Sequence, residues 1–210
     1  MRNRAVILVA STVLLALPLS GCGASEQEVP TPTKTIVSHG DFIEYLSLEK
    51  SVEAADAVIF GTWVDSREEL LFPIMDDEQD PAKNPQAGVE LTEEELLDSA
   101  NPVTISTIKI TKVLKGKLAA GGTIDVRQFG GVKDGVRHAD SDTTLLKESK
   151  SKNLLLLLTY WAEEDDFTPL NPIEGAWAVS GDKIACLSEA EPVFSIKSLD
   201  EVVAKAKASK

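Results

Sequence analysis

Cysteine and histidine are scarce in this chain of 210 residues, which contains two of each. It has no G-x-S-x-G, H-E-x-x-H or C-x-x-C motif and no glycine-rich phosphate loop. Its N-terminal apolar run, from Ala5 to Leu17, is shorter than the roughly 20 residues that a transmembrane helix needs. These absences argue against the enzyme classes that the motifs define and against a membrane-spanning helix, and we expect no cofactor.

Basic residues are also few, and the formal net charge is −13. The first 21 residues contain Arg2 and Arg4 and no acid, so the remaining 19 basic and 34 acidic residues leave a net charge of −15. Nucleic acid is therefore not expected as a partner, because its phosphates would be repelled. For the same reason, charge alone would not hold the protein on an anionic membrane.

The N-terminus has the layout of a secretory signal peptide, with two arginines, an apolar run and then Pro18. The motif that follows, Leu19-Ser20-Gly21-Cys22, resembles the lipobox of bacterial lipoproteins. This resemblance implies that residues 1–21 are removed and that Cys22 carries a diacylglycerol and further fatty acyl chains, such as palmitate. The protein would then be anchored at the extracytoplasmic face of the cell membrane, since two acyl chains give stable attachment. The alternative is an ordinary signal peptide in which Cys22 is incidental.

Residues 22–39 are poor in large apolar side chains and contain prolines, serines and threonines, so we expect a flexible tether after the lipidated Cys22. If Cys22 is acylated, Cys186 has no partner for an intramolecular disulfide. Cys186 lies in the apolar sequence KIACL, which favours a small buried side chain over a reactive thiol.

The stretch Val103–Gly116 predicts a long central strand. Its apolar residues change phase between Ile105 and Ile108, which predicts a β-bulge near Ser106–Thr107 and a strand that serves two sheets. Further strands are expected at residues 56–65, with a bend or close approach at Gly61, at 123–129, with Asp125 and Arg127 facing water, and at 154–161, 176–179 and 183–187.

Helices are expected around these strands. Ser47 is a candidate N-cap in the segment 41–55, and Thr92 to Glu95 form a capping box for a helix over 93–99. Ser198 to Glu201 form a second capping box, for a C-terminal helix with Leu199, Val202, Val203 and Ala206 on one face. Residues 40–210 are thus predicted to form one mainly β domain, a small OB-like β-barrel of five to six strands with short flanking helices. A β-sandwich is the alternative.

The segment 73–102 is predicted to be a long acidic loop, because it contains nine acids, one base and four prolines. Its consecutive acids from Asp76 to Asp80 could suggest a Ca²⁺ site, but they lack the spacing and the glycine of an EF-hand loop. A solvated loop is therefore the preferred interpretation.

Short motifs spread over residues 55–185 resemble those of uncharacterised exported bacterial proteins and of the OB-like barrel in netrin and tissue metalloproteinase inhibitor modules. They are Ala55 to Gly61, Val113 to Gly116, Gly130-Gly131 and Glu174-Gly175. The resemblance implies an OB-like fold. It does not imply protease inhibition, because those inhibitors use a free N-terminal cysteine held by disulfides, whereas Cys22 would be lipidated and tethered.

Polar chemistry is concentrated at Arg137, His138 and Asp140. A histidine with nearby carboxylates can bind a cation or orient a nucleophile, although a solvated loop is the preferred interpretation. Trp161 is a candidate binding residue if it is exposed. We therefore expect a non-enzymatic, monomeric binding module with an envelope protein or a glycan as partner. The alternative is an exported hydrolase or metal-dependent enzyme that uses the His138 loop.

Overall fold

The computed structural model describes residues 32–45, 47–73, 80, 82, 88, 90–187 and 193–208, without the side chains of residues 193–196 and 205–208. The predicted signal peptide, Cys22 and the first part of the predicted tether lie outside the described residues, as does most of the acidic segment from residue 74 to residue 89. In the described part of the chain, no helix combines the length and the apolar character needed to cross a bilayer.

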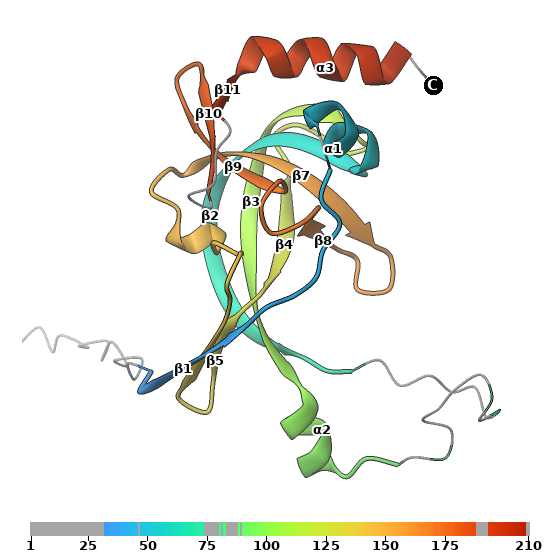
Figure 1. Cartoon of the computed structure of the whole chain (residues 1–210), viewed down its shortest axis with the longest axis vertical. Coiled ribbons are helices and arrows are strands. Elements are labelled where there is room, and N and C mark those ends of the chain that lie inside the picture. The colour runs from blue at the N-terminus through green and yellow to red at the C-terminus, as the bar shows by residue number, and fades with distance from the viewer. Residues whose placement is uncertain are drawn as a thin grey trace, which may run out of the picture. The chain divides into compact units, whose positions relative to one another are not determined.

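The chain is mainly β, with short helices between and after the strands (Figure 1). The strands are β1 (Lys34–Ser38), β2 (Ala57–Leu71), β3 (Asn101–Lys115), β4 (Thr123–Phe129), β5 (Gly131–Lys133), β6 (Val136–Asp140), β7 (Asn153–Trp161), β8 (Asp166–Pro169), β9 (Ala176–Ser180), β10 (Lys183–Cys186) and β11 (Val193–Ser195). The helices are α1 (Leu48–Ala54), α2 (Glu93–Ser99), the 3₁₀ turn η1 (Leu146–Glu148) and α3 (Ile196–Ala208). The mainly β class and the C-terminal helix are as predicted.

The larger sheet is mixed and has the strand order β11-β10-β9-β7-β2-β3-β4-β8. Strand β8 also pairs with β7, so part of the sheet curls into a ring. Between β4 and β8 the ring is joined by one parallel pair, Val126 with Phe167. The sheet is therefore partly ringed, and β9, β10 and β11 extend from it beyond β7.

The longest strands, β2 and β3, pair from Val58 to Leu71 of β2 and are kinked by register shifts. Trp63 pairs with Ile108 and Asp65 with Thr107, so Val64 is the extra residue of a bulge in β2. The predicted bulge at Ser106–Thr107 is therefore on the wrong strand, although it lies almost opposite the observed one. Two further register shifts leave Thr111 and Leu114 of β3 without a paired residue in β2. These irregularities increase the twist that curls the sheet.

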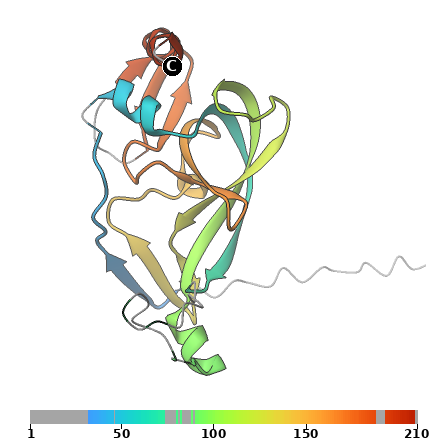
Figure 2. The ribbon, with the colours of Figure 1, turned by 90° about the vertical axis from the view of Figure 1, so that its right-hand side faces the viewer.

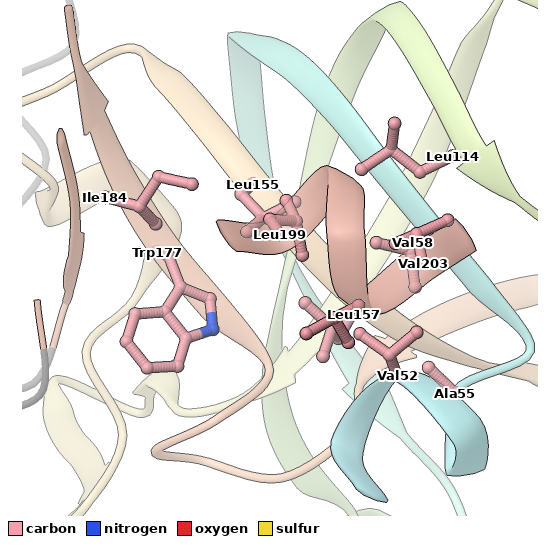
Figure 3. Close-up of a cluster of buried hydrophobic side chains, with 11 residues drawn as sticks. Val52, Ala55, Val58, Leu114, Leu155, Leu157, Trp177, Ile184, Leu199 and Val203 are labelled. Atoms are coloured by element: carbon pink, nitrogen blue, oxygen red, sulfur yellow. The ribbon is translucent and has the colours of Figure 1, made fainter. Parts of the chain in front are cut away.

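The five leucines of β7 are completely buried and divide between the two faces of the sheet. Leu155 and Leu157 lie on one face of the sheet, in a cluster with Val52 of α1 and Leu199 of α3 (Figure 3). Leu154, Leu156 and Leu158 lie in a second cluster on the other face, inside the ringed part of the sheet. The leucine run is therefore a strand buried on both faces, as predicted.

The C-terminal helix α3 packs on the first of these clusters through Leu199, Val202 and Val203. The helix begins at Ile196, two residues before the predicted N-cap Ser198. The cluster also contains Trp177 and is bordered by Cys186. Cys186 is half-buried, less than expected, and its Sγ donates to the carbonyl of Ile173 at 2.9 Å.

A smaller sheet has the order β1-β6-β5 (Figures 1 and 2). Strand β1 pairs with β6 in parallel, Lys34 with Val136 through Ser38 with Asp140. Residues 34–38 were expected in the tether, and residues 136–140 in a solvated loop; both expectations are wrong. Local patterns could not reveal this pairing, because its two strands are about 100 residues apart and largely polar.

Candidate functional site

A cavity of about 440 Å³ opens beside the ringed part of the larger sheet. Residues from β2, β3, β4, β6, β7 and β8 line it together with the loops that follow β6, β7 and β8. They are Leu71, Val103, Arg127, Gln128, Phe129, Asp140, Thr143, Trp161, Glu164, Thr168, Pro169, Asn171 and Pro172. The exposed lining is largely apolar and includes three charged side chains, Arg127, Asp140 and Glu164, a combination typical of ligand pockets.

Two aromatic side chains of this cavity are open to solvent. Trp161, the last residue of β7, is 50% exposed, and Phe129, the last residue of β4, is 38% exposed. The indole Nε1 of Trp161 donates to Thr168 Oγ1 at 2.9 Å, which ties the ring to β8. A large, exposed and oriented aromatic surface is a common contact for ligands. Trp161 is therefore exposed, which is the condition under which we expected it to be a binding residue.

Asp140 also lines the cavity, but one of its oxygens is used within the turn after β6. Asp140 Oδ1 accepts from the backbone N–H of Asp142 at 2.9 Å and from Thr143 Oγ1 at 3.1 Å. These bonds hold the turn on which Thr143 reaches the cavity. Asp140 is therefore a positioning residue at the edge of the cavity.

Arg137 and His138, the other two predicted site residues, are not part of this lining. Arg137 forms an ion pair with Glu148 of η1. His138 is half-buried in β6, where its backbone pairs with Ile36 and Gly131. The structure thus brings Asp140 and Trp161 together in one cavity and separates them from the pair that suggested catalysis.

The other histidine, His39, is the one that contacts a hydroxyl group. Its Nδ1 lies 2.7 Å from Ser141 Oγ, and that hydroxyl also donates to Asp142 Oδ2 at 2.8 Å. In a catalytic triad the histidine lies between the serine and the acid. Here the serine is in the middle, and both His39 and Ser141 are exposed, so this cluster does not have the geometry of a triad.

Arg127 is a charged residue of the cavity whose role the sequence did not indicate. It was expected to face water, but only 7% of it is exposed. Its Nε lies 3.1 Å from Asp166 Oδ2, and its Nη2 lies 3.8 Å from Glu164 Oε2. The expectation that Arg127 lies on a water-facing side of β4 is wrong, because Val126, Arg127 and Gln128 are all buried. Strand β8 lies beside β4 in the sheet and supplies Asp166, which pairs with Arg127. Only the non-local pairing of β4 with β8 could have revealed this.

A second hollow, of about 260 Å³, adjoins the cavity and shares Leu71, Val103, Arg127 and Glu164 with it. Its charged lining consists of Arg67, Glu69, Asp125, Arg127, Glu164, Asp165 and Asp166. Arg67 binds Asp125 at 2.9 Å and Glu69 at 2.6 Å. These two hydrogen-bonded ion pairs raise the pKa of the Arg67 guanidinium. Acids outnumber bases in this hollow.

The carboxyl group of Asp166 has a raised pKa, first because burial disfavours its charged form. Arg127 acts in the opposite direction, whereas the carboxylates of Glu164, Asp125 and Asp165 raise the pKa further. In addition, Asp166 Oδ1 and Glu164 Oε2 are buried and have no hydrogen-bond partner among the described residues.

A metal centre is not supported in the described part of the chain, where no three histidine, cysteine or acidic side chains are arranged to hold an ion. Comparison with protein-family models and with curated proteins gives no significant match for this chain. Its function must therefore be argued from its own residues.

Proposed function

We propose that this protein is a lipid-anchored binding module, held at the outer face of the cell membrane by acylated Cys22. The observation that carries the binding role is the cavity of about 440 Å³ that Trp161 and Phe129 help to line. The N-terminal lipobox supports the anchor, and the exposed aromatic surface supports a ligand or partner at the cavity.

The strand pairing supports a small barrel of OB type as the finer description of the fold. Strands β2, β3 and β4 are sequential antiparallel neighbours, β8 lies beside β4 in parallel, and β7 joins β8 to β2. A five-stranded, partly open Greek-key barrel has this arrangement. OB-type barrels use their face and adjoining loops to bind extended ligands, and the cavity lies between such loops here.

Binding fits this site better than the alternative, an exported hydrolase that uses His138. A hydrolase of that kind needs a base within hydrogen-bond reach of a nucleophile, next to a place for the substrate. His138 is outside the lining of the cavity, and Asp140 is engaged by the turn that follows it. The other two charged groups of the lining, Arg127 and Glu164, are ion-paired with each other.

The anchor is tested by the mass of the mature N-terminus and by membrane fractionation of the native protein and of Cys22→Ser. We expect a diacylglyceryl mass on Cys22 and sedimentation with membranes. The variant should be released into the soluble fraction. An unmodified Cys22, or a variant that still sediments, contradicts the anchor.

The cavity is tested by nuclear magnetic resonance on the domain from residue 32, with envelope extract separated into peptide, glycan and lipid fractions. We expect at least one fraction to shift the indole N–H of Trp161 and the amide of Phe129. Trp161→Ala should abolish the shift at Phe129. Replacing Val64, which is 52% exposed and outside the cavity lining, by alanine should not. No shift with any fraction contradicts the binding role.

A further inference from the structure

We propose that the acidic hollow beside the aromatic cavity binds a lysine or arginine side chain from a basic, partly apolar segment of a partner protein. This inference rests on the binding function proposed above and names the chemical class of the ligand. Three features carry it: two buried carboxylate oxygens that accept no hydrogen bond from the described residues, an excess of acids in the hollow, and its continuity with the aromatic cavity.

The oxygens that accept no hydrogen bond from the described residues are Asp166 Oδ1 and Glu164 Oε2, of which the second lies 3.8 Å from Arg127 Nη2. Asp166 is 9% exposed, and its other oxygen is already bound by Arg127. A buried carboxylate oxygen without a donor costs free energy, and the cost is greater when the group is charged. Both residues line the hollow. An ammonium or guanidinium group that enters there would supply the donors that these oxygens lack.

The charge balance of the hollow favours a cation in the same way. The two arginines face five carboxylates, those of Glu69, Asp125, Glu164, Asp165 and Asp166. Arg67 is committed to Asp125 and Glu69, so Arg127 is the base that offsets Glu164 and Asp166. An additional positive charge would reduce this excess of acids, and charge-assisted hydrogen bonds to it would be strong. An anionic ligand would be repelled.

The shape of the site indicates that this cation belongs to a larger, partly apolar molecule. The hollow and the cavity share Leu71, Val103, Arg127 and Glu164, so a ligand that contacts Trp161 can also reach the carboxylates. A peptide segment with a basic residue beside apolar residues has this combination of groups. The net charge of −13 also steers basic partners towards the protein.

The test uses three capped tripeptides that place lysine, norleucine or glutamate between two leucines. Each is titrated into the domain from residue 32, and the Trp161 indole N–H resonance is followed. The lysine peptide should bind about tenfold more tightly than the norleucine peptide, as a hydrogen bond to a charged group allows. The glutamate peptide should bind most weakly.

Two variants test whether the hollow causes this preference. Asp166→Asn and Glu164→Gln should each reduce the preference for lysine over norleucine to about threefold or less. Glu163→Gln is the matched control, because Glu163 is exposed in the same loop and is not part of either lining. It should leave the preference unchanged.

The outcomes separate this inference from the proposed function. If lysine and norleucine peptides bind equally, and Trp161→Ala weakens both, the cavity binds ligands but the cation site is wrong. A preference for lysine that survives in both Asp166→Asn and Glu164→Gln also overturns the cation site. The absence of any response to the lysine peptide overturns it too, while the envelope fractions decide the binding function independently.

Discussion

Gly61 lies in β2 where the strand passes so close to β3 that a side chain has no room. A Cβ built at this position would collide with Cγ2 of Ile108 and would lie 3.2 Å from the carbonyl of Lys109. Gly61→Ala should therefore lower the free energy of unfolding by about 2 kcal/mol, the usual cost of overpacking a core. Urea denaturation monitored by circular dichroism measures this change.

The collision with Ile108 can be isolated by a double-mutant cycle. Ile108→Ala removes Cγ2 at the price of a cavity, so Gly61→Ala should cost less in that background than in the native protein. Equal costs in the two backgrounds would show that the strain at Gly61 comes from the backbone of Lys109 alone.

The carboxyl group of Asp166 should make the stability depend on pH with an unusual sign. Its pKa in the folded protein is raised above its ordinary value of 3.8, chiefly by burial. The folded state therefore holds this proton more tightly than the unfolded state. As the pH rises from 3.8 through the raised pKa, Asp166 lowers the free energy of unfolding. In Asp166→Asn the free energy of unfolding should rise relative to the native protein over this pH window and then level off.

Glu68 provides a comparison of opposite sign. Burial alone would raise its pKa, but Lys147 and the backbone N–H of Val132 together bring it below the ordinary value of 4.5. Glu68 therefore stabilises the fold above pH 4.5, and this contribution is lost as the pH falls through its folded pKa. Glu68→Gln should have a lower free energy of unfolding than the native protein near pH 7, and this difference should shrink in acid. Urea denaturation between pH 3 and pH 7 measures it. Parallel pH curves for both variants would contradict the two assignments.

At the scale of elements, the C-terminal carbonyls of two short helices are bound by lysines that come from distant strands. Lys115 of β3 donates to the carbonyls of Val52, Glu53 and Ala55 at the end of α1, at 2.5 to 2.8 Å. Lys133 of β5 does the same for Leu97, Asp98 and Ala100 at the end of α2, at 2.6 to 3.0 Å. Neither helix has a basic residue in its own last turn.

These lysines donate to carbonyls at helix ends, where intrahelical pairing stops, and complement the negative end of each helix dipole. Of these carbonyls, that of Leu97 also accepts from the backbone N–H of Ala100. Lys115→Met should lower the free energy of unfolding by about 1 to 2 kcal/mol, because α1 packs on the core through Val52. Lys133→Met should mainly speed hydrogen exchange in α2, which buries no residue. Exposed Lys117 is the control, and Lys117→Met should change neither. If Lys115→Met behaves like the control, the contacts contribute no net stability.

Elements specified by neighbouring residues were predictable from the sequence, and elements specified by distant pairing were not. Ser47 caps α1 and Thr92 forms the capping box of α2, as expected, because both motifs act within one turn. The strand β1, the capping lysines and the bulge at Val64 depend on partners far along the chain. The same holds for the site: exposed Trp161 was identified, whereas Arg127 and Asp166 are brought together only by β8.

At the scale of the whole domain, β7 links the two hydrophobic clusters. Leu156 and Leu157 are adjacent and completely buried, yet they belong to clusters on opposite faces of the sheet. Strand β7 also pairs with β2, β8 and β9. A strand that contributes to both clusters cannot leave one of them without disturbing the other. We therefore expect residues 32–208 to unfold as one cooperative unit.

Leu156→Ala and Leu157→Ala test this expectation as a matched pair. Each should lower the free energy of unfolding by about 2 to 5 kcal/mol, the usual cost of a buried leucine truncation, with little change in the denaturant slope. Whichever leucine is removed, hydrogen exchange should accelerate to a similar extent in β4 and in β9. Strand β4 belongs to the ring, and β9 contributes Trp177 to the cluster that also contains Leu199 of α3. Global unfolding exposes every amide at the same free energy. If Leu157→Ala accelerated exchange only in α3, β9 and β10 while the amides of β4 stayed protected, the two clusters would therefore be separate folding units.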